Sequence, residues 1–390
     1  MGKFTLCLLS AALAVLVVAR SLLPEPAQAV MTTSVYGYNL LAEEMPPVTE
    51  TAGSAIIGEM NSYYFSRPAT AKNACTGALE GKNLILICAD NWQPKAKRSI
   101  SLTSLLSDGI AFSNVYRPDW YQGMEGREFA LLTGIVPTNV NGQSALSWLG
   151  QQEVYFPFTL ARTLGDRGYD CRAFVTETSR RAAYTAMGFE SVEAVGVPAQ
   201  TMVKNTAESC FGEAPFFVFY VWQEGECENA LAALLAELET RELTEETAVC
   251  LVTASDDGQR AQIFLRSGDL TAPVPEAPCS ELDVTPTLLN LFGADYDARF
   301  LSGRDIFAPC SAAEAAEDPL PLVILRGSAY SGWVTDAGSY SLLEGFLPET
   351  HFPDTQAAES YARVVSVQVY ERYIFARRVM ENNYFHLIFG

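Results

Sequence analysis

Positive charge is scarce in this sequence. Its 390 residues include 26 lysines and arginines against 46 aspartates and glutamates, so the formal net charge is −20 at pH 7. Because like charges repel, such an acidic surface disfavours binding to nucleic acid or to bare anionic lipid. A polyanionic ligand would have to be met locally, by a basic pocket.

Histidine is rarer still, and no zinc site is evident. The two histidines, His351 and His386, both lie near the C-terminus, and none of the cysteine spacings is that of a zinc site. Internal repeats are not apparent. With 49% hydrophobic and 18% charged residues, the chain can bury a sizeable core, which excludes a disordered protein and allows one large domain or two ordinary ones.

Apolar runs long enough to cross a membrane are missing after the first thirty residues. Lys3 precedes an apolar run at residues 4–19, and Ala27-Gln28-Ala29 forms a small-x-small pattern typical of secretory signals. The sixteen-residue run is short for a spanning helix, which needs about 20. We therefore expect residues 1–29 to be a signal peptide or a single membrane anchor. In both cases the remaining chain lies outside the cytoplasm, secreted or anchored to the cell membrane.

Nine cysteines in an exported chain raise the question of disulfides. Cys88 and Cys250 lie inside apolar runs, where we expect free thiols packed as small hydrophobic side chains. Two further pairs could bridge loops: Cys210 with Cys227, and Cys279 with Cys310.

The pattern of the chain changes after a lead-in at residues 30–80, which we expect to be extended and partly helical. Residues 83–88 form a continuous apolar run that ends at Ala89-Asp90, typical of a strand buried on both faces. Helix-like segments, including residues 156–164 and 230–238, lie between further runs of this kind. Those runs are residues 170–175, 216–222, 248–253 and 262–265. The alternation predicts an α/β fold with a largely parallel sheet between helices.

The last part of the chain has a different pattern. After an acidic linker at residues 312–318, shorter strand-like pieces are separated by glycines, and helices are predicted at residues 355–364 and 369–385. We therefore divide the chain into a core domain at residues 81–318 and a small C-terminal α+β subdomain at residues 319–390.

Acidic residues follow several predicted strands. Asp90 follows the first, Glu224 and Glu226 follow the third, and Asp256-Asp257 follow the fourth. Ligand sites in parallel sheets form beyond the carboxyl ends of the strands, and converging carboxylates suit a divalent cation. The same residue types also form turns and helix caps, so both interpretations stay open.

Two segments resemble a known family. Residues 281–307, ELDVTPTLLNLFGADYDARFLSGRDIF, resemble a segment found throughout sulfatase-like proteins. Residues 82–93, KNLILICADNWQ, resemble the first strand of lipoteichoic acid synthases, in which an acidic residue at the strand's end binds manganese. The resemblance implies that role for Asp90.

Further segments extend this resemblance in unbroken order over residues 80–390. Residues 121–133 resemble the segment with the family's catalytic threonine, and residues 179–184 with Gly188-Phe189 resemble the segment whose arginine contacts the substrate phosphate. Residues 323–336 and 376–389 resemble the family's terminal strands and closing helix. The resemblance therefore implies the sulfatase and alkaline-phosphatase fold, and implies Arg180 as the substrate-binding arginine.

In that family the threonine attacks a phosphatidylglycerol head group and passes glycerophosphate to a growing polymer outside the membrane. The resemblance thus implies an anionic glycerophosphate lipid or teichoic polymer as partner. This chemistry needs a hydroxyl whose proton is withdrawn by a bound metal, with cationic groups against the phosphate oxygens.

The matching positions are largely replaced. Counting four residues back from Glu128, the nucleophile position holds Met124, whose thioether has no proton to lose. The family's Asp-His metal pair reads Asp256-Asp257, a change that favours harder cations. A site on Asp90, Asp256 and Asp257 would therefore bind Mn²⁺, Mg²⁺ or Ca²⁺ weakly, or no metal would bind.

The family's other histidines are missing too. The corresponding regions, residues 176–178 and 223–226, contain none. Of the residues that contact the substrate in the family, Arg180 remains. A structural role for Arg180 in a salt bridge is equally consistent with the sequence. Three other hydroxyls lie nearby but out of register: Ser113, Thr133 and Thr138.

The sequence is therefore consistent with three functions. We expect a catalytically impaired pseudoenzyme with a scaffolding, binding or regulatory role at the cell envelope. The first alternative is an active, divergent metal-dependent phosphotransferase, or a hydrolase of phosphodiesters or sulfate esters. The second is a module that binds an envelope polymer. Its stacking surfaces would be Trp92, Trp120, Tyr121 and Trp222.

Overall fold

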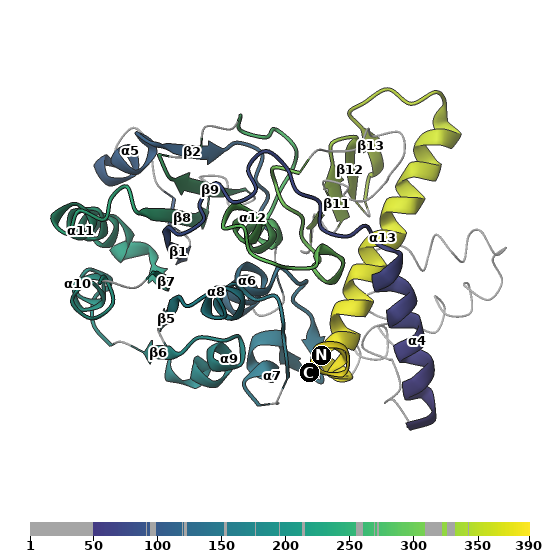
Figure 1. Ribbon diagram of the computed structural model, residues 1–390. Helices are drawn as coiled ribbons and strands as arrows, with labels where there is room; N and C mark the ends of the chain where they lie inside the picture. Colours follow the sequence, from purple (N-terminus) through teal and green to yellow (C-terminus); the bar gives the residue numbers. More distant parts are fainter. Residues whose placement is uncertain are drawn as a thin grey trace, which may run out of the picture.

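A seven-stranded sheet forms the centre of the main body, with strand order β2-β9-β8-β1-β7-β5-β6 (Figure 1). The computed structural model describes residues 50–90, 92–93, 99–118, 120, 123–151, 154–175, 177–194, 196–212, 215–254, 260–268, 270, 273–308, 322–325, 332–341 and 343–390. The strands are β1 (Asn83–Asp90), β2 (Gly109–Phe112), β5 (Asp170–Val175), β6 (Ser191–Ala194), β7 (Phe216–Gln223), β8 (Thr247–Ala254) and β9 (Ala261–Arg266).

The five strands from β8 to β6 run parallel, which confirms the predicted α/β fold. β1 lies at the centre with both faces buried: Leu84 and Leu86 join one hydrophobic cluster, while Ile85 and Ile87 join the other. β9 was predicted as a strand, but it runs antiparallel to β8, and β2 runs antiparallel to β9. β2 and β6, each only four residues long, were not predicted.

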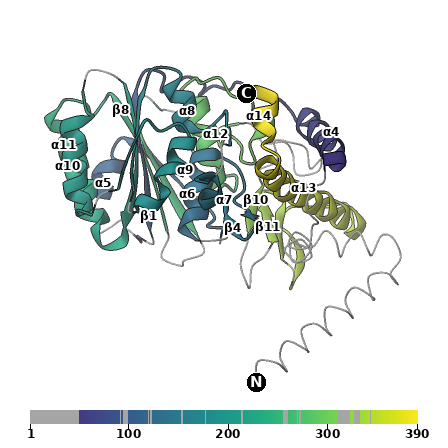
Figure 2. The same ribbon diagram turned by 90° about the horizontal axis from the view of Figure 1, so that it is seen from below.

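Helices cover both faces of this sheet (Figure 2). One face carries α5 (Ile100–Leu106), α10 (Ala199–Ser209) and α11 (Cys227–Thr240). The other carries α6 (Met124–Thr133), α8 (Leu160–Gly165) and α12 (Val284–Leu291). The helix predicted at residues 230–238 lies within α11. The one predicted at residues 156–164 begins only at Leu160, because the Thr159 side chain accepts a hydrogen bond from the Arg162 amide and caps it.

The C-terminal part contains the predicted meander. β10 (Val323–Leu325), β11 (Gly332–Thr335), β12 (Gly338–Ser341) and β13 (Gly345–Pro348) form an antiparallel sheet. The prediction of two helices after it was wrong, because a single helix, α13 (Thr355–Glu381), crosses the expected gap. No glycine or proline interrupts it, and Val365 and Ser366 in the gap are buried against the core. The shorter α14 (Tyr384–Phe389) follows.

The lead-in contributes a helix that packs on α13. α4 (Glu50–Ser66) lies beside α13 in both views, and the rings of Tyr63 and Phe375 stack at 4.0 Å between centroids. The helical part of the predicted lead-in is thereby confirmed. The predicted signal or anchor at residues 1–29 and the linker at residues 312–318 lie outside the described residues, and the domain division stays a prediction. No helix in the described ranges is both long and apolar enough to cross a membrane.

The described cysteines are buried free thiols. Cys88 and Cys250 are free inside central strands, as predicted. Cys210, Cys227 and Cys279 are also free, so the suggested Cys210–Cys227 bridge is wrong. Cys310, the suggested partner of Cys279, lies outside the described residues.

Candidate active site

The candidate site lies at the carboxyl edge of the sheet, where β1 ends between β7 and β8. Asp90 is in register with Gln223 at the end of β7, and Cys88 is in register with Val252 of β8. The neighbouring parallel strands therefore end at the same edge of the sheet. The predicted convergence of the carboxylates that follow them requires this arrangement. The Asp90 side chain, and Asp256 and Asp257 beyond the end of β8, lie outside the described residues, so their convergence stays a prediction.

Met124 is the first residue of α6, and it is partly buried against the core. The helix is attached to the central strand one turn later, where Nη1 of Arg127 donates to the carbonyl oxygen of Ala89 at 3.4 Å. Ala89 directly precedes Asp90. The start of α6 is therefore held against the end of β1, and it presents a thioether, which has no ionisable proton.

Arg127 has a carboxylate partner that sequence reasoning missed. Its Nε lies 2.6 Å from Oε1 of Glu281, which is fully buried, and Nε1 of Trp120 donates to Oε2 of the same carboxylate at 2.9 Å. Glu281 opens the segment that resembles sulfatase-like proteins. Two acidic residues, Glu281 and Asp283, directly before the apolar helix α12 were the available signal for buried charges.

Arg180 is a salt-bridging arginine. It belongs to a short 3-10 turn, Thr178–Arg180, and its Nη1 donates to Oε1 of Glu128 on α6. The hydroxyl of Tyr184, on α9 (Arg181–Ala186), donates to the other oxygen of that carboxylate. Glu128 is fully buried, whereas Glu177, 3.4 Å from Nη2 of Arg180, is exposed.

This burial shifts the titration of the cluster. Removal from water raises the pKa of Glu128, while the Arg180 charge and the hydrogen bonds from Tyr184 and Arg180 oppose the rise. Burial, together with the nearby Glu128 carboxylate, also raises the pKa of Tyr184, which keeps its hydroxyl as a donor. Of the two alternatives for Arg180, the structure shows the ion pair.

The two acidic residues after β7 differ in their surroundings. Glu224 is exposed, and Oε2 of Glu226 accepts the amide of Ala199 at 3.3 Å, at the start of α10. Of the two interpretations of these acidic residues, metal binding and helix capping, Glu226 shows helix capping. The out-of-register hydroxyls Thr133 and Thr138 are buried, and Thr133 donates to the carbonyl of Phe129.

The proposed stacking surface is not formed by the tryptophans. Trp92, Trp120 and Trp222 expose only 8%, 3% and 0% of their surface, because all three pack into the core. That prediction was wrong for these residues, while Tyr121 lies outside the described ones. Aromatic side chains close to strand ends are here part of the core.

A metal site is neither supported nor tested by the described side chains. They include no group of three or more histidines, cysteines, aspartates or glutamates that could hold a metal ion. The carboxylates of Asp90, Asp256 and Asp257 would suit a hard cation in their chemistry. Met124, where the family resemblance puts a threonine, offers a soft sulfur in place of an oxygen ligand.

Comparison with known proteins identifies the fold. No protein-family model matches the sequence, and no curated protein matches it significantly. The lipoteichoic acid synthase LtaP from Listeria monocytogenes is similar in structure, with a TM-score of 0.60 and 14% identity over 80% of this chain and 97% of that one. The chain has a lipoteichoic acid synthase-like, sulfatase-like fold.

A second solved structure agrees with this assignment. A protein of the alkaline phosphatase superfamily from Vibrio parahaemolyticus matches with a TM-score of 0.60 and 15% identity, over 86% of this chain and 97% of that one. At such identities the likeness establishes the sulfatase-like fold, while the activity depends on the residues at the site.

Proposed function

We propose that this chain is a catalytically impaired member of the lipoteichoic acid synthase-like group, with a binding, scaffolding or regulatory role at the cell envelope. The observation that carries the proposal is Met124 at the start of α6, beside the end of β1. The resemblance to the family puts its nucleophilic threonine at this position. A thioether cannot give up a proton and cannot form the phosphoester that the family's reaction requires.

The charges around this position support the same conclusion. Transfer of a phosphoryl group needs cations that face the phosphate oxygens. Arg127 is paired with Glu281, and Arg180 with Glu128, both inside the protein. Breaking a buried ion pair costs about 3–5 kcal/mol, so neither arginine is readily released to bind a substrate.

The cellular setting rests on the sequence. We propose an extracytoplasmic protein, secreted or held at the membrane by residues 1–29, with an anionic glycerophosphate lipid or teichoic polymer as the partner that the family resemblance implies. The core domain at residues 81–318 would supply the old cleft, and residues 319–390 would form the subdomain beside it.

A hydrolysis assay tests the impairment. The purified chain is incubated with bis(p-nitrophenyl) phosphate and with p-nitrophenyl sulfate, in the presence of Mn²⁺, Mg²⁺ or Ca²⁺, and bound metal is measured by elemental analysis. We expect no turnover. Turnover that disappears in Asp256→Ala would refute the proposal and favour the alternative, a metal-dependent hydrolase using Asp90, Asp256 and Asp257.

A restored variant tests whether Met124 and Asp257 are the decisive losses. Met124→Thr combined with Asp257→His returns the family's hydroxyl and imidazole, and Met124→Val with Asp257→His is the matched control without the hydroxyl. We expect tighter metal binding in the Thr variant but no turnover, because residues 176–178 and 223–226 still lack histidine. Turnover in the Thr variant alone would show that only these two groups were lost.

A further inference from the structure

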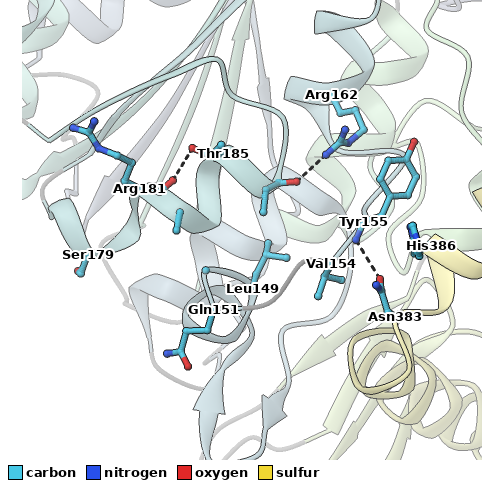
Figure 3. A pocket seen from close by; sticks show the side chains of 13 residues that line it. Leu149, Gln151, Val154, Tyr155, Arg162, Ser179, Arg181, Thr185, Asn383 and His386 are labelled. Atoms are coloured by element: carbon cyan, nitrogen blue, oxygen red, sulfur yellow. Dashed lines mark hydrogen bonds between the residues drawn. The ribbon is translucent and has the colours of Figure 1, made fainter. Parts of the chain in front are cut away.

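A cavity of about 940 Å³ lies beside α9 and reaches the C-terminal helix α14 (Figure 3). Its walls come from the end of α7 (Ala145–Leu149), the segment before α8, the exposed side of α9, and Asn383 and His386 at α14. Neither Met124 nor Arg180 lines it. Its volume is in the range of small-molecule sites, which is about 300–1,000 Å³.

Arg162 of α8 is held rigidly in this wall. Its Nε donates to the carbonyl oxygen of Phe156 at 3.0 Å, and its Nη2 donates to that of Ala186 at 2.9 Å. The guanidinium also lies over the ring of Tyr155, 4.7 Å from the centroid. These contacts fix the plane of the guanidinium before any ligand arrives, which lowers the entropy cost of binding.

The charge of Arg162 has no carboxylate partner within the described part of the chain. Other arginines, including Arg127, Arg172, Arg180 and Arg299, pair with an aspartate or glutamate. No acidic residue is among those described as lining the cavity. Among the described residues that line it, the charged side chains are Arg162 and Arg181, so this part of the lining is positive in a chain of net charge −20 and attracts anions.

Part of the cavity lining is apolar. Leu149, Val154 and Ala182 line the cavity together with the Tyr155 ring. Figure 3 shows the Arg181 side chain directed away from Arg162, so Arg162 supplies the positive end. The complementary ligand has one oxyanion group joined to a compact apolar body.

We propose that this cavity binds an amphipathic organic anion, whose oxyanion pairs with Arg162 and whose apolar body packs on Tyr155, Leu149 and Val154. The two backbone acceptors leave Nη1 of Arg162 available to the oxyanion, and charge-assisted bonds of this type are strong and directional. A bound ligand would link α8 and α9 to α14 through Asn383 and His386. Ligand binding in this cavity does not depend on whether the site at the strand ends is catalytically active.

Benzenesulfonate and benzenesulfonamide form a matched pair of probes, because they have nearly the same size but only the first is charged. Each is titrated into the full-length chain by isothermal calorimetry. We expect saturable binding of benzenesulfonate, and binding of benzenesulfonamide that is weaker by roughly tenfold or more. Equal binding of the two compounds, or no binding of benzenesulfonate, would overturn the proposal.

Three variants locate the binding site. Arg162→Gln is expected to weaken benzenesulfonate binding roughly tenfold, whereas Arg363→Gln, the same charge change at an exposed position of α13, leaves it unchanged. Ala182→Trp, at an exposed residue of the wall, adds a bulky side chain to the cavity and is expected to weaken binding without removing Arg162. This variant keeps the proposal testable if Arg162→Gln fails to fold. Equal losses in Arg162→Gln and Arg363→Gln, or full binding by Ala182→Trp, would contradict the site.

Discussion

Arg180 and Glu128 form an ion pair inside the protein, and the Glu128 carboxylate is fully buried. The pair joins α6, the helix that begins with Met124, to the turn that precedes α9. The arginine that matches the family's phosphate ligand thus has an internal anion as its partner. The family resemblance implies a phosphate as the partner of Arg180, whereas the structure shows the Glu128 carboxylate as its partner.

Loss of this ion pair should be strongly destabilising. We expect Glu128→Gln to lower the free energy of unfolding by about 3 kcal/mol, because it leaves the Arg180 charge uncompensated in a largely buried place. The matched control is Glu177→Gln, since Glu177 is the exposed second partner of Arg180, and it should cost less than about 0.5 kcal/mol. Urea unfolding measures both values, and similar losses in the two variants would contradict a structural role for the buried pair.

Gly188 should be irreplaceable for a steric reason. It has a φ of +101°, and a Cβ added there would lie 2.7 Å from the Cα of Arg162. We expect Gly188→Ala to cost about 3 kcal/mol, the sum of left-handed backbone strain and overpacking. Gly168→Ala is the control, because Gly168 has a φ of +87° but open space around it, and about 1 kcal/mol is expected. Thermal or urea unfolding that ranks the two variants equally would show that the contact with α8 does not matter.

Asp305 should make stability depend on pH. Burial raises the pKa of its carboxyl to about 6, although the Phe307 amide and the Asn73 side chain donate hydrogen bonds to it. The folded state thus holds this proton more tightly than the unfolded state. The contribution of Asp305 to stability is therefore greatest below about pH 4, falls by about 3 kcal/mol as the pH rises to about 6, and is constant above that.

The difference in unfolding free energy between the wild type and Asp305→Asn isolates this contribution from other carboxyls. Measured by urea unfolding at half-unit steps, the difference should fall between about pH 4 and pH 6 and then level off. A difference that is constant, or that rises with pH, would show that Asp305 is not the titrating group.

The cysteines should be unreactive in the native protein. The seven cysteines that the structure describes are buried free thiols, and burial raises the pKa of both Cys210 and Cys250 to about 12, so the reactive thiolate is scarce. In a variant with Cys7→Ser and Cys310→Ser, Ellman's reagent should label no thiol rapidly under native conditions and seven after unfolding without reductant. Fewer than seven would reveal a disulfide among them.

The central strands could be predicted because their signal is local. Each buried strand is a continuous apolar run, so β1, β5, β7 and β8 were found nearly to the residue. The short edge strands β2 and β6 carry too few residues for such a signal. The continuity of α13 was missed because its middle depends on packing: Nε1 of Trp333 donates to Ser366 at 3.0 Å, within the predicted gap.

At the candidate site, too, some features follow from the sequence and others only from the tertiary structure. The sequence by itself determined that Met124 stands where the family resemblance puts the nucleophile and that residues 176–178 and 223–226 contain no histidine, since residue identity needs no coordinates. Only the tertiary structure decided that Arg180 is bound by Glu128, Arg127 by Glu281, and Arg162 by no described carboxylate. The physical reason is that the energy of an ion pair depends on the distance between the charges and on their burial. Arg180 and Glu128 are 52 residues apart in the sequence, and only the packing of the folded chain brings them together.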